Sequence, residues 1–389
     1  MGNGEMKYLV WFSEVMGVGN IRSSKALEFF GTPQNIYNAT YNERLSSGVF
    51  TKAELSRLDK IALRKATDIM TDCLKSEIDI IGINDKRYPT ALSAIENPPL
   101  VLYVKGEFPD FNNTPSLAVV GPRKVSEFGK KAAYSLSFRL ARAGFIVVSG
   151  GALGCDTYAH AGALKSGGTT VLVMGCGINA EYLMKNKPLR DEVASRGCLI
   201  SELPPKAPVT KYAFPIRNRI ISALTLGTVL VEAPEISGAL ITARLANEQG
   251  RDVFVIPGAP DKEEYKGSNA LLRDGAKALL DLSDIFTEYI VRFPDKIDIK
   301  KAYDTKIIDN KPKKDTKPVE ETKIISKKFN VGLSKEAKIV YNCIDKQKFL
   351  PEEILNTGLD SSSLLSALTE LEMEFMIKAV PGGMYELCE

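Results

Sequence analysis

One stretch decides the fold class: residues 116–156 read SLAVVGPRKVSEFGKKAAYSLSFRLARAGFIVVSGGALGCD. An apolar run at 116–120 leads through a glycine turn into a helix that Ser126 can cap and Gly144 can end. A second apolar run at 145–148 then leads into another glycine-rich turn. Short apolar strands that alternate with helices are typical of a parallel sheet covered by helices on both faces. We therefore expect an α/β fold.

The same alternation continues along the chain, with strands expected at 169–174, 198–201, 228–232 and 252–256. We assign it to a central domain over residues 76–290. Residues 1–75 are predicted to be helical. Residues 291–331, rich in Lys, Asp, Thr and Pro, are predicted to form a flexible charged linker. Residues 332–389 show three helical stretches followed by a glycine-containing hairpin, which predicts a winged-helix domain.

Composition excludes some classes of protein. The 389 residues include 51 Lys and Arg against 48 Asp and Glu, and a net charge of +3 neither predicts nor excludes a nucleic-acid partner. Six scattered cysteines and a single histidine argue against a zinc site, so we expect no metal and reduced thiols in a cytoplasmic protein. No apolar run approaches the about 18 residues that span a bilayer, so no membrane contact is expected.

The outer domains carry weaker signals for DNA. The turn Gly17-Val18-Gly19 resembles a helix-hairpin-helix turn, whose glycines let backbone amides approach a phosphate, and Arg22 and Lys25 are the nearest cations. A purely structural turn is the favoured alternative. The last expected helix, 361–374, contains no Arg or Lys, which argues against major-groove recognition and favours a protein contact.

Three glycine turns are expected where strands of the central sheet end, and backbone amides at that edge suit an anion. They are Gly121-Pro122-Arg123, Gly150-Gly151-Ala152-Leu153-Gly154 and Gly175-Cys176-Gly177. Each alone is explained equally well as a tight turn, but together they predict a phosphate site. Neither a P-loop nor a dinucleotide-binding glycine motif occurs, so we expect no cofactor.

His160 follows Asp156 by four residues and therefore lies on the same face of a helix. A catalytic dyad is one interpretation, but no nucleophile stands beside it. We favour a hydrogen-bonding role in which Asp156 and His160 support the loop formed by Gly150, Gly151 and Gly154.

The segment Lys211-Tyr212-Ala213-Phe214-Pro215-Ile216-Arg217-Asn218-Arg219 interleaves basic and aromatic residues. Single-stranded nucleic acid is bound in this way, because cations neutralise phosphates and a ring stacks on any base. For Lys211 and Phe214 we favour nucleic-acid contact. For Arg217 and Arg219 an alternative stays open, in which the arginine holds a carboxylate such as Glu232.

Several motifs occur in an order that resembles the DprA/Smf family, the DNA-processing proteins of natural transformation. They are Gly121-Pro122-Arg123, the run 149–156 with Ala159-His160, the run 214–219, Val231-Glu232-Ala233, the run 237–244 and Pro257-Gly258. The resemblance covers roughly residues 80–285. It implies an extended Rossmann-like domain, flanked by a helical domain of the helix-hairpin-helix or SAM-like kind and by a winged helix.

The resemblance also implies a function. Family members bind single-stranded DNA without sequence preference, form homodimers, help load RecA against single-strand binding protein, and are not enzymes. Carried over by motif, Arg123 and Lys211 are expected on phosphates, Gly175 or Gly177 at a close backbone approach, and Phe214 under a base. The segment 269–285 is similar to the family's dimer face.

Two competing functions are weighed against this one. A nucleotide phosphoribohydrolase on the same kind of fold carries a double-glycine motif before its catalytic glutamate, and here only Gly227-Thr228-Val229-Leu230-Val231-Glu232 remains, with the glutamate one residue late. A transcription regulator acting through the winged helix is disfavoured by the acidic second half of the last helix.

Overall fold

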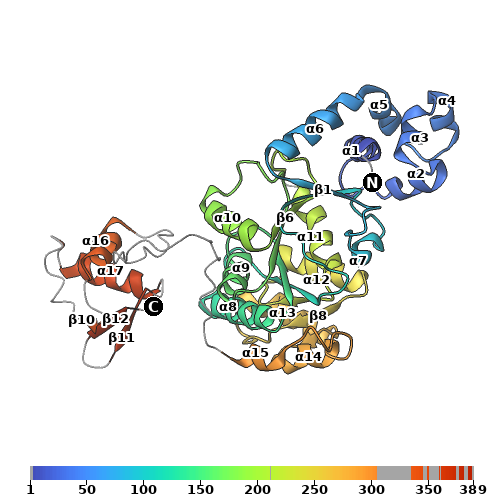
Figure 1. The fold of residues 1–389 in the computed structure, drawn as a ribbon. Helices are drawn as coiled ribbons and strands as arrows, with labels where there is room; N and C mark the ends of the chain where they lie inside the picture. The colour runs from blue at the N-terminus through green and yellow to red at the C-terminus, as the bar shows by residue number, and fades with distance from the viewer. Residues whose placement is uncertain are drawn as a thin grey trace. The chain divides into compact units, whose positions relative to one another are not determined.

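The computed structural model describes residues 3–210, 212–304, 334–344, 348–349, 359, 361–373, 376–380 and 384–387. The chain divides into two compact units, Met1–Pro312 and Lys313–Glu389, and each is described by itself (Figure 1).

The larger unit is built on a sheet in which nine strands of the described residues pair in the order β1-β2-β6-β5-β4-β3-β7-β8-β9. The strands from β6 to β9 run parallel, and the antiparallel pair β1-β2 is attached to β6. This confirms the predicted α/β class with a parallel sheet. The bounds are β1 Asp79–Gly82, β2 Val101–Gly106, β3 Ser116–Val120, β4 Ile146–Ser149, β5 Thr170–Met174, β6 Cys198–Ser201, β7 Gly227–Leu230, β8 Asp252–Val255 and β9 Lys277–Ala278.

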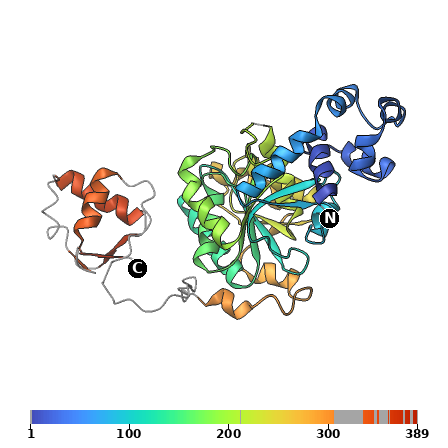
Figure 2. The ribbon, with the colours of Figure 1, turned by 45° about the horizontal axis from the view of Figure 1, so that its top comes forward.

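Helices cover both faces of the sheet because its buried strands alternate their side chains between two apolar layers. Leu117 and Val119 of β3 join one cluster, and Ala118 and Val120 join the other. Figures 1 and 2 show α8, α9 and α10 on one side of the strands and α11 and α12 on the other. The bounds are α7 Thr90–Ser93, α8 Glu127–Arg142, α9 Cys155–Lys165, α10 Lys187–Arg196, α11 Ala213–Ala223, α12 Gly238–Glu248, α13 Lys266–Arg273, α14 Ser283–Tyr289 and α15 Ile299–Tyr303.

The amino-terminal helices pack directly onto this sheet. Trp11 and Phe12 of α1 are fully buried in one cluster with Val101 and Tyr103 of β2. The segment 1–75, predicted as a separate helical domain, is therefore helical in its described part, but it shares a core with the α/β domain. Their bounds are α1 Asn3–Met16, α2 Arg22–Phe30, α3 Pro33–Asn38, α4 Tyr41–Ser46, α5 Lys52–Lys60 and α6 Leu63–Lys75.

The predicted linker starts too early at residue 291. Phe293, Ile297 and Ala302 are buried in the cluster that α8 contributes to, and Arg142 pairs with Asp304 at 3.0 Å. Apolar residues are too sparse there to show a helical period in the sequence, although three of them suffice to anchor the segment. Residues 305–331 lie outside the described residues.

The smaller unit has two described helices, α16 Lys335–Cys343 and α17 Ser361–Met373, and a three-stranded antiparallel sheet in the order β10-β12-β11. Its strands are β10 Lys348–Phe349, β11 Ile377–Val380 and β12 Met384–Leu387. Val340, Leu368 and Leu371 form its core with Phe349. The helix expected at 351–357 and the hairpin turn at 381–383 lie outside the described residues, so a winged helix stays a prediction. Among the helices described in either unit, none has the length and apolarity needed to cross a bilayer.

Candidate nucleic-acid interface

Loops from four strands meet at the carboxyl edge of the parallel sheet. Strand β3 lies between β4 and β7, so chain connections leave it in opposite directions and open a crevice where α/β proteins bind ligands. A pocket of about 560 Å³ occupies this place. Its walls come from the turn after β3, the loop after β4, the first turns of α11, and the segment that joins β7 to α12.

Arg123 and Phe214 stand together in the wall of this pocket. The Arg123 guanidinium lies 5.5 Å from the centroid of the Phe214 ring, a cation–π distance. Arg123 is exposed, and within the described part of the chain it forms no ion pair, while Phe214 is half-buried. A cation and a ring are thus available side by side. Lys211, the third residue expected here, lies outside the described residues.

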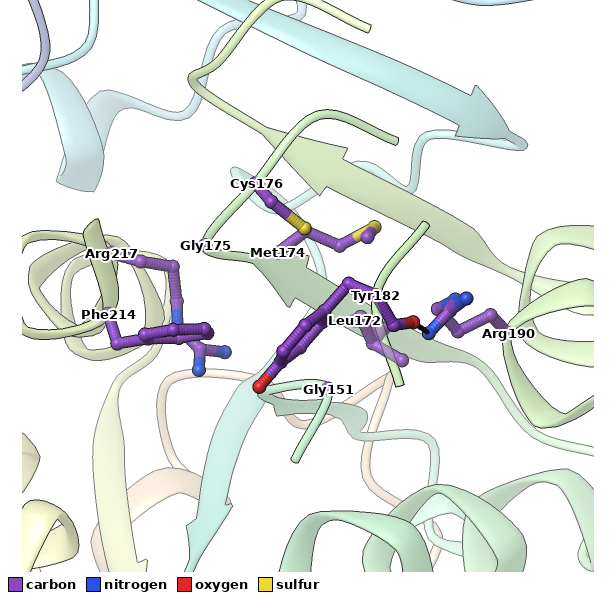
Figure 3. A pocket seen from close by; sticks show the side chains of 9 residues that line it. All are labelled: Gly151, Leu172, Met174, Gly175, Cys176, Tyr182, Arg190, Phe214 and Arg217. Atoms are coloured by element: carbon purple, nitrogen blue, oxygen red, sulfur yellow. Dashed lines mark hydrogen bonds between the residues drawn. The ribbon is translucent and has the colours of Figure 1, made fainter. Parts of the chain in front are cut away.

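The two glycines expected at a close backbone approach serve contacts within the protein. A Cβ on Gly175 would lie 2.8 Å from Cδ1 of Phe214, so the glycine leaves room for the ring (Figure 3). A Cβ on Gly177 would collide with the carbonyl oxygens of Pro204 and Pro205. Both glycines are buried, and the amide of Gly177 donates to the Ala207 carbonyl at 3.0 Å. Gly177 therefore has no surface to offer DNA, and Gly175 serves to seat the ring of Phe214.

The loop after β4 is supported from below by His160. Its Nε2 donates to the Gly150 carbonyl at 2.8 Å, and its Nδ1 faces the Thr170 hydroxyl at 2.8 Å. Burial lowers the pKa of His160 to about 4, so the imidazole is neutral near pH 7. Gly154, at the loop's end, has a φ of +92° and lies against the backbone of Arg123, which only a glycine accommodates.

Asp156 and Arg217 form a buried charged centre under the same loop. Burial raises the pKa of Asp156, and the positive charge of Arg217 opposes that rise. Arg217 Nη1 donates to the Val173 carbonyl at 2.6 Å, and its buried Nε has no partner among the described residues. A Cβ on Gly150 would strike both side chains. Arg217 therefore lies beneath the pocket rather than on its rim.

Arg219, expected on DNA, is instead a buried structural residue. Its Nη2 donates to both carboxylate oxygens of Glu202 at 2.6 Å, and the two side chains are 4% and 9% exposed. The sequence alternative, in which the arginine holds a carboxylate, is therefore correct for Arg219, but the carboxylate belongs to Glu202 and not to Glu232. Glu232 accepts hydrogen bonds from the amide and hydroxyl of Ser126, at 2.7 and 2.5 Å, at the start of α8.

These motifs meet at one sheet edge, and comparison with known proteins identifies the group that shares them. The family model described as DNA recombination-mediator protein A matches residues 79–290. The chain belongs to this family.

Members of the family match well beyond the site. The DNA processing protein DprA of Bacillus subtilis (strain 168) is 39% identical over 211 residues, which are 54% of this chain and 71% of the relative. Protein Smf of Synechocystis sp. is 32% identical over 287 residues, 72% of this chain and 71% of the relative. The X-ray structure of DprA from Streptococcus pneumoniae superposes with a TM-score of 0.64 at 31% identity, covering 72% of this chain and 97% of that one.

A further solved structure bears on the ligand. DNA processing protein A from Helicobacter pylori, described as having a unique single-stranded DNA binding mode, superposes with a TM-score of 0.50 at 27% identity. It covers 56% of this chain and 98% of its own.

The Gly17-Val18-Gly19 turn, considered from sequence as a DNA contact, instead packs against the α/β domain of its own chain. Both glycines have positive φ, +76° and +67°. The Gly19 amide donates to Glu202 Oε1 at 3.3 Å, and Asn97 Nδ2 donates to the Gly19 carbonyl at 3.2 Å. The amide that a phosphate would need is therefore already used by Glu202.

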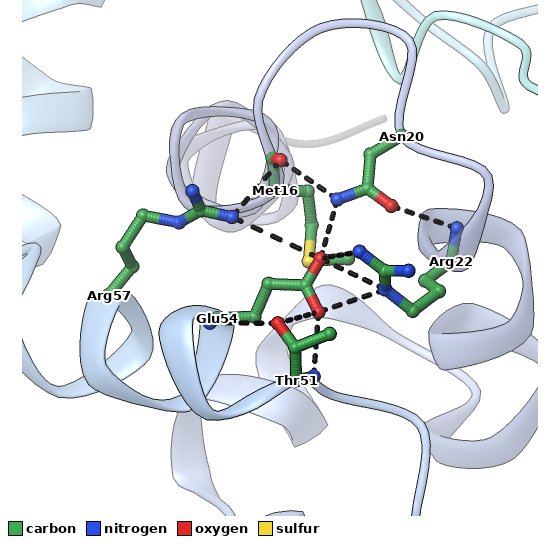
Figure 4. Close-up of polar contacts among 6 residues, drawn as sticks. All are labelled: Met16, Asn20, Arg22, Thr51, Glu54 and Arg57. Atoms are coloured by element: carbon green, nitrogen blue, oxygen red, sulfur yellow. Dashed lines mark hydrogen bonds and ion pairs between the residues drawn. The ribbon is translucent and has the colours of Figure 1, made fainter.

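Arg22, the first cation after that turn, is also engaged. Its Nε and Nη2 donate to the buried carboxylate of Glu54 at 2.9–3.1 Å, and Asn20 and Thr51 donate to the same carboxylate (Figure 4). Burial raises the pKa of Glu54, but the hydrogen bonds from Arg22, Asn20 and Thr51 outweigh it and lower that pKa to about 2. The turn is thus locked by a network inside the helical region.

Sequence reasoning missed three residues around the site: Tyr182, Arg190 and Glu202. Tyr182 lies beside Phe214, Arg190 donates to the backbone that carries Tyr182, and Glu202 pairs with Arg219. None of the three falls in a glycine turn or a basic cluster, so only their closeness in space to the expected residues identifies them.

Proposed function

We propose that this chain binds single-stranded DNA at the carboxyl edge of its sheet and acts as a recombination mediator in natural transformation. The observation that carries the proposal is the exposed guanidinium of Arg123 over the half-buried ring of Phe214 at a pocket wall. A cation neutralises a phosphate, and a ring stacks on any base, which is what capture without sequence preference requires. Membership of the family and the single-stranded DNA binding of the Helicobacter pylori relative support it.

Further parts of the proposal rest on the family resemblance. Lys211 adds a second phosphate contact, residues 269–285 form a homodimer face, and the bound strand is handed to RecA in competition with single-strand binding protein in the cytoplasm. Arg217 stabilises the site from beneath, and Arg219 is left out of the DNA contact because Glu202 holds it inside the protein.

The proposed role is binding without catalysis. A nucleotide phosphoribohydrolase needs a carboxylate that is free to act beside the phosphate loops. Glu232, the residue nearest to that pattern, is fully buried and accepts two hydrogen bonds from Ser126. Release of free base from nucleoside monophosphates by the purified protein would contradict the binding role.

Fluorescence anisotropy with labelled single-stranded and duplex oligonucleotides tests the proposal. We expect wild type to prefer single strands, with affinity that falls as salt rises. Arg123→Ala should reduce the slope of log K against log salt by about 0.7, the share of one phosphate contact on a single strand. Phe214→Ala should weaken binding by about 5- to 150-fold, the range for one base–aromatic stack, without changing the slope.

Arg64→Ala is the matched control, because Arg64 is an exposed arginine on α6 with no ion pair in the described part of the chain. It should bind like wild type. The proposal fails if wild type shows no preference for single strands, or if Arg123→Ala and Phe214→Ala both bind like wild type.

A further inference from the structure

A second ring stands beside Phe214. The centroids of Tyr182 and Phe214 are 5.4 Å apart, with the ring planes inclined by 42°. Both rings line one small pocket together with Gly151 and Gly175, and Figure 3 shows Tyr182 pointing into that pocket from its own segment. Tyr182 is half-buried, and its hydroxyl has no hydrogen-bond partner in the described part of the chain. The ring is therefore partly exposed and lies directly beside Phe214.

The backbone that carries Tyr182 is held firmly. It lies between β5 and α10, and Arg190 Nη1 of α10 donates to the Tyr182 carbonyl at 2.6 Å and to the Leu183 carbonyl at 3.2 Å. Arg190 is itself buried, and burial lowers its pKa. The buried guanidinium of Arg190 donates to two backbone carbonyls and so orients this segment, although its burial costs desolvation free energy.

The same segment is tied to the glycine loop of the site. Asn186 Nδ2 donates to the Thr157 hydroxyl at 3.1 Å and to the Ala152 carbonyl at 3.4 Å. Leu183 has a φ of +41°, a left-handed conformation that a residue with a Cβ rarely adopts. Strain that the surroundings maintain at one point of a binding edge is typical of a segment that holds a side chain in place.

We infer that Tyr182 is a second stacking surface for a base of bound single-stranded DNA, next to Phe214, and that Arg190 and Asn186 are positioning residues for it. The inference rests on the proposed function and deepens its site. Stacking uses the face of the ring and not the hydroxyl, so phenylalanine fills the role equally well. It also requires a base, so a strand without bases gains nothing from Tyr182.

Anisotropy titrations of the full chain with a homopyrimidine strand and with an abasic strand of the same length test this. Tyr182→Ala should raise Kd for the base-containing strand by about 5- to 150-fold and leave the salt slope unchanged, because no phosphate contact is lost. Its Kd for the abasic strand should equal that of wild type. Tyr182→Phe should behave as wild type with both strands, and so should Tyr41→Ala, which removes an exposed tyrosine from α4.

The outcomes separate this inference from the proposed function. If Tyr182 only packs against Phe214, Tyr182→Ala will weaken both strands equally, and the inference fails. It also fails if Tyr182→Ala binds like wild type while Phe214→Ala does not, and the proposed function then stands. If wild type does not prefer single strands, both fail. Arg190→Gln should reduce the discrimination between the two strands in a protein that still melts cooperatively, and full discrimination would exclude Arg190 as a positioning residue.

Discussion

The buried pair of Arg219 and Glu202 provides the sharpest test of which basic residues bind DNA. Arg219→Ala leaves Glu202 almost fully buried, and the Gly19 amide at 3.3 Å is then its remaining hydrogen-bond donor among the described residues. Removing one partner of a buried ion pair costs about 3–5 kcal/mol, because the other charge is left without compensation. The loss falls on the stability of the larger unit and not on a surface contact.

That cost converts into a melting temperature. Unfolding entropy is about 2.1 cal/mol/K per residue, which is about 0.6 kcal/mol/K for a unit of about 300 residues. Arg219→Ala should therefore lower the melting temperature by about 5–8 °C, measured by circular dichroism. Well below that temperature, anisotropy should show the wild-type Kd and the wild-type salt slope.

Arg123→Ala should show the opposite pattern, an unchanged melting temperature and a salt slope smaller by about 0.7. The two arginines thus serve as controls for each other. The reasoning is refuted if Arg219→Ala melts like wild type while its affinity and salt slope fall, since that is the behaviour of a phosphate contact.

Three other predictions concern stability. Burial raises the pKa of Glu54, but its hydrogen bonds outweigh burial and lower that pKa to about 2. The Glu54 carboxylate should therefore contribute about 3 kcal/mol to the free energy of unfolding, fully present above about pH 4.5 and lost as pH falls towards 2. Urea unfolding of Glu54→Gln at several pH values should lack this loss. Burial lowers the pKa of His160 to about 4, so the contribution of its neutral imidazole to the free energy of unfolding is full above about pH 6.5 and lost as pH falls through 4. A step in DNA affinity near pH 6.5 that disappears in His160→Gln would contradict a neutral imidazole. Gly177→Ala should destabilise by about 1–3 kcal/mol through collision with the Pro205 carbonyl, whereas Gly238→Ala, where a Cβ meets nothing within 4 Å, should melt normally.

Much of the fold could be predicted from local patterns. The alternation of apolar runs and helices between residues 116 and 256 identified every strand of the parallel part except the short β9 within a few residues, because buried parallel strands are apolar along their whole length. The antiparallel pair β1-β2 and the packed segment 291–304 were not predicted. Their apolar residues are few, and they acquire meaning only against the core that buries them.

The site divides in the same way. Sequence alone placed Arg123 at a carboxyl edge, because a glycine turn after a buried strand lies there. It singled out Phe214 as a stacking ring, but only the structure places that ring in the first turn of α11 at the same edge. Arg217 and Arg219 are further along α11, past the edge, and that helix packs its basic side chains against Val173 and Glu202.

Only the tertiary structure decided which charges are free and which rings are close. Glu202 is 17 residues from Arg219 and 183 from Gly19, and Tyr182 is held by an arginine eight residues away on another element. A residue's type shows which interactions it can form, and this much is present in the sequence. Whether a guanidinium meets a carboxylate in the core or a phosphate in solvent depends on partners that the chain brings together only by folding.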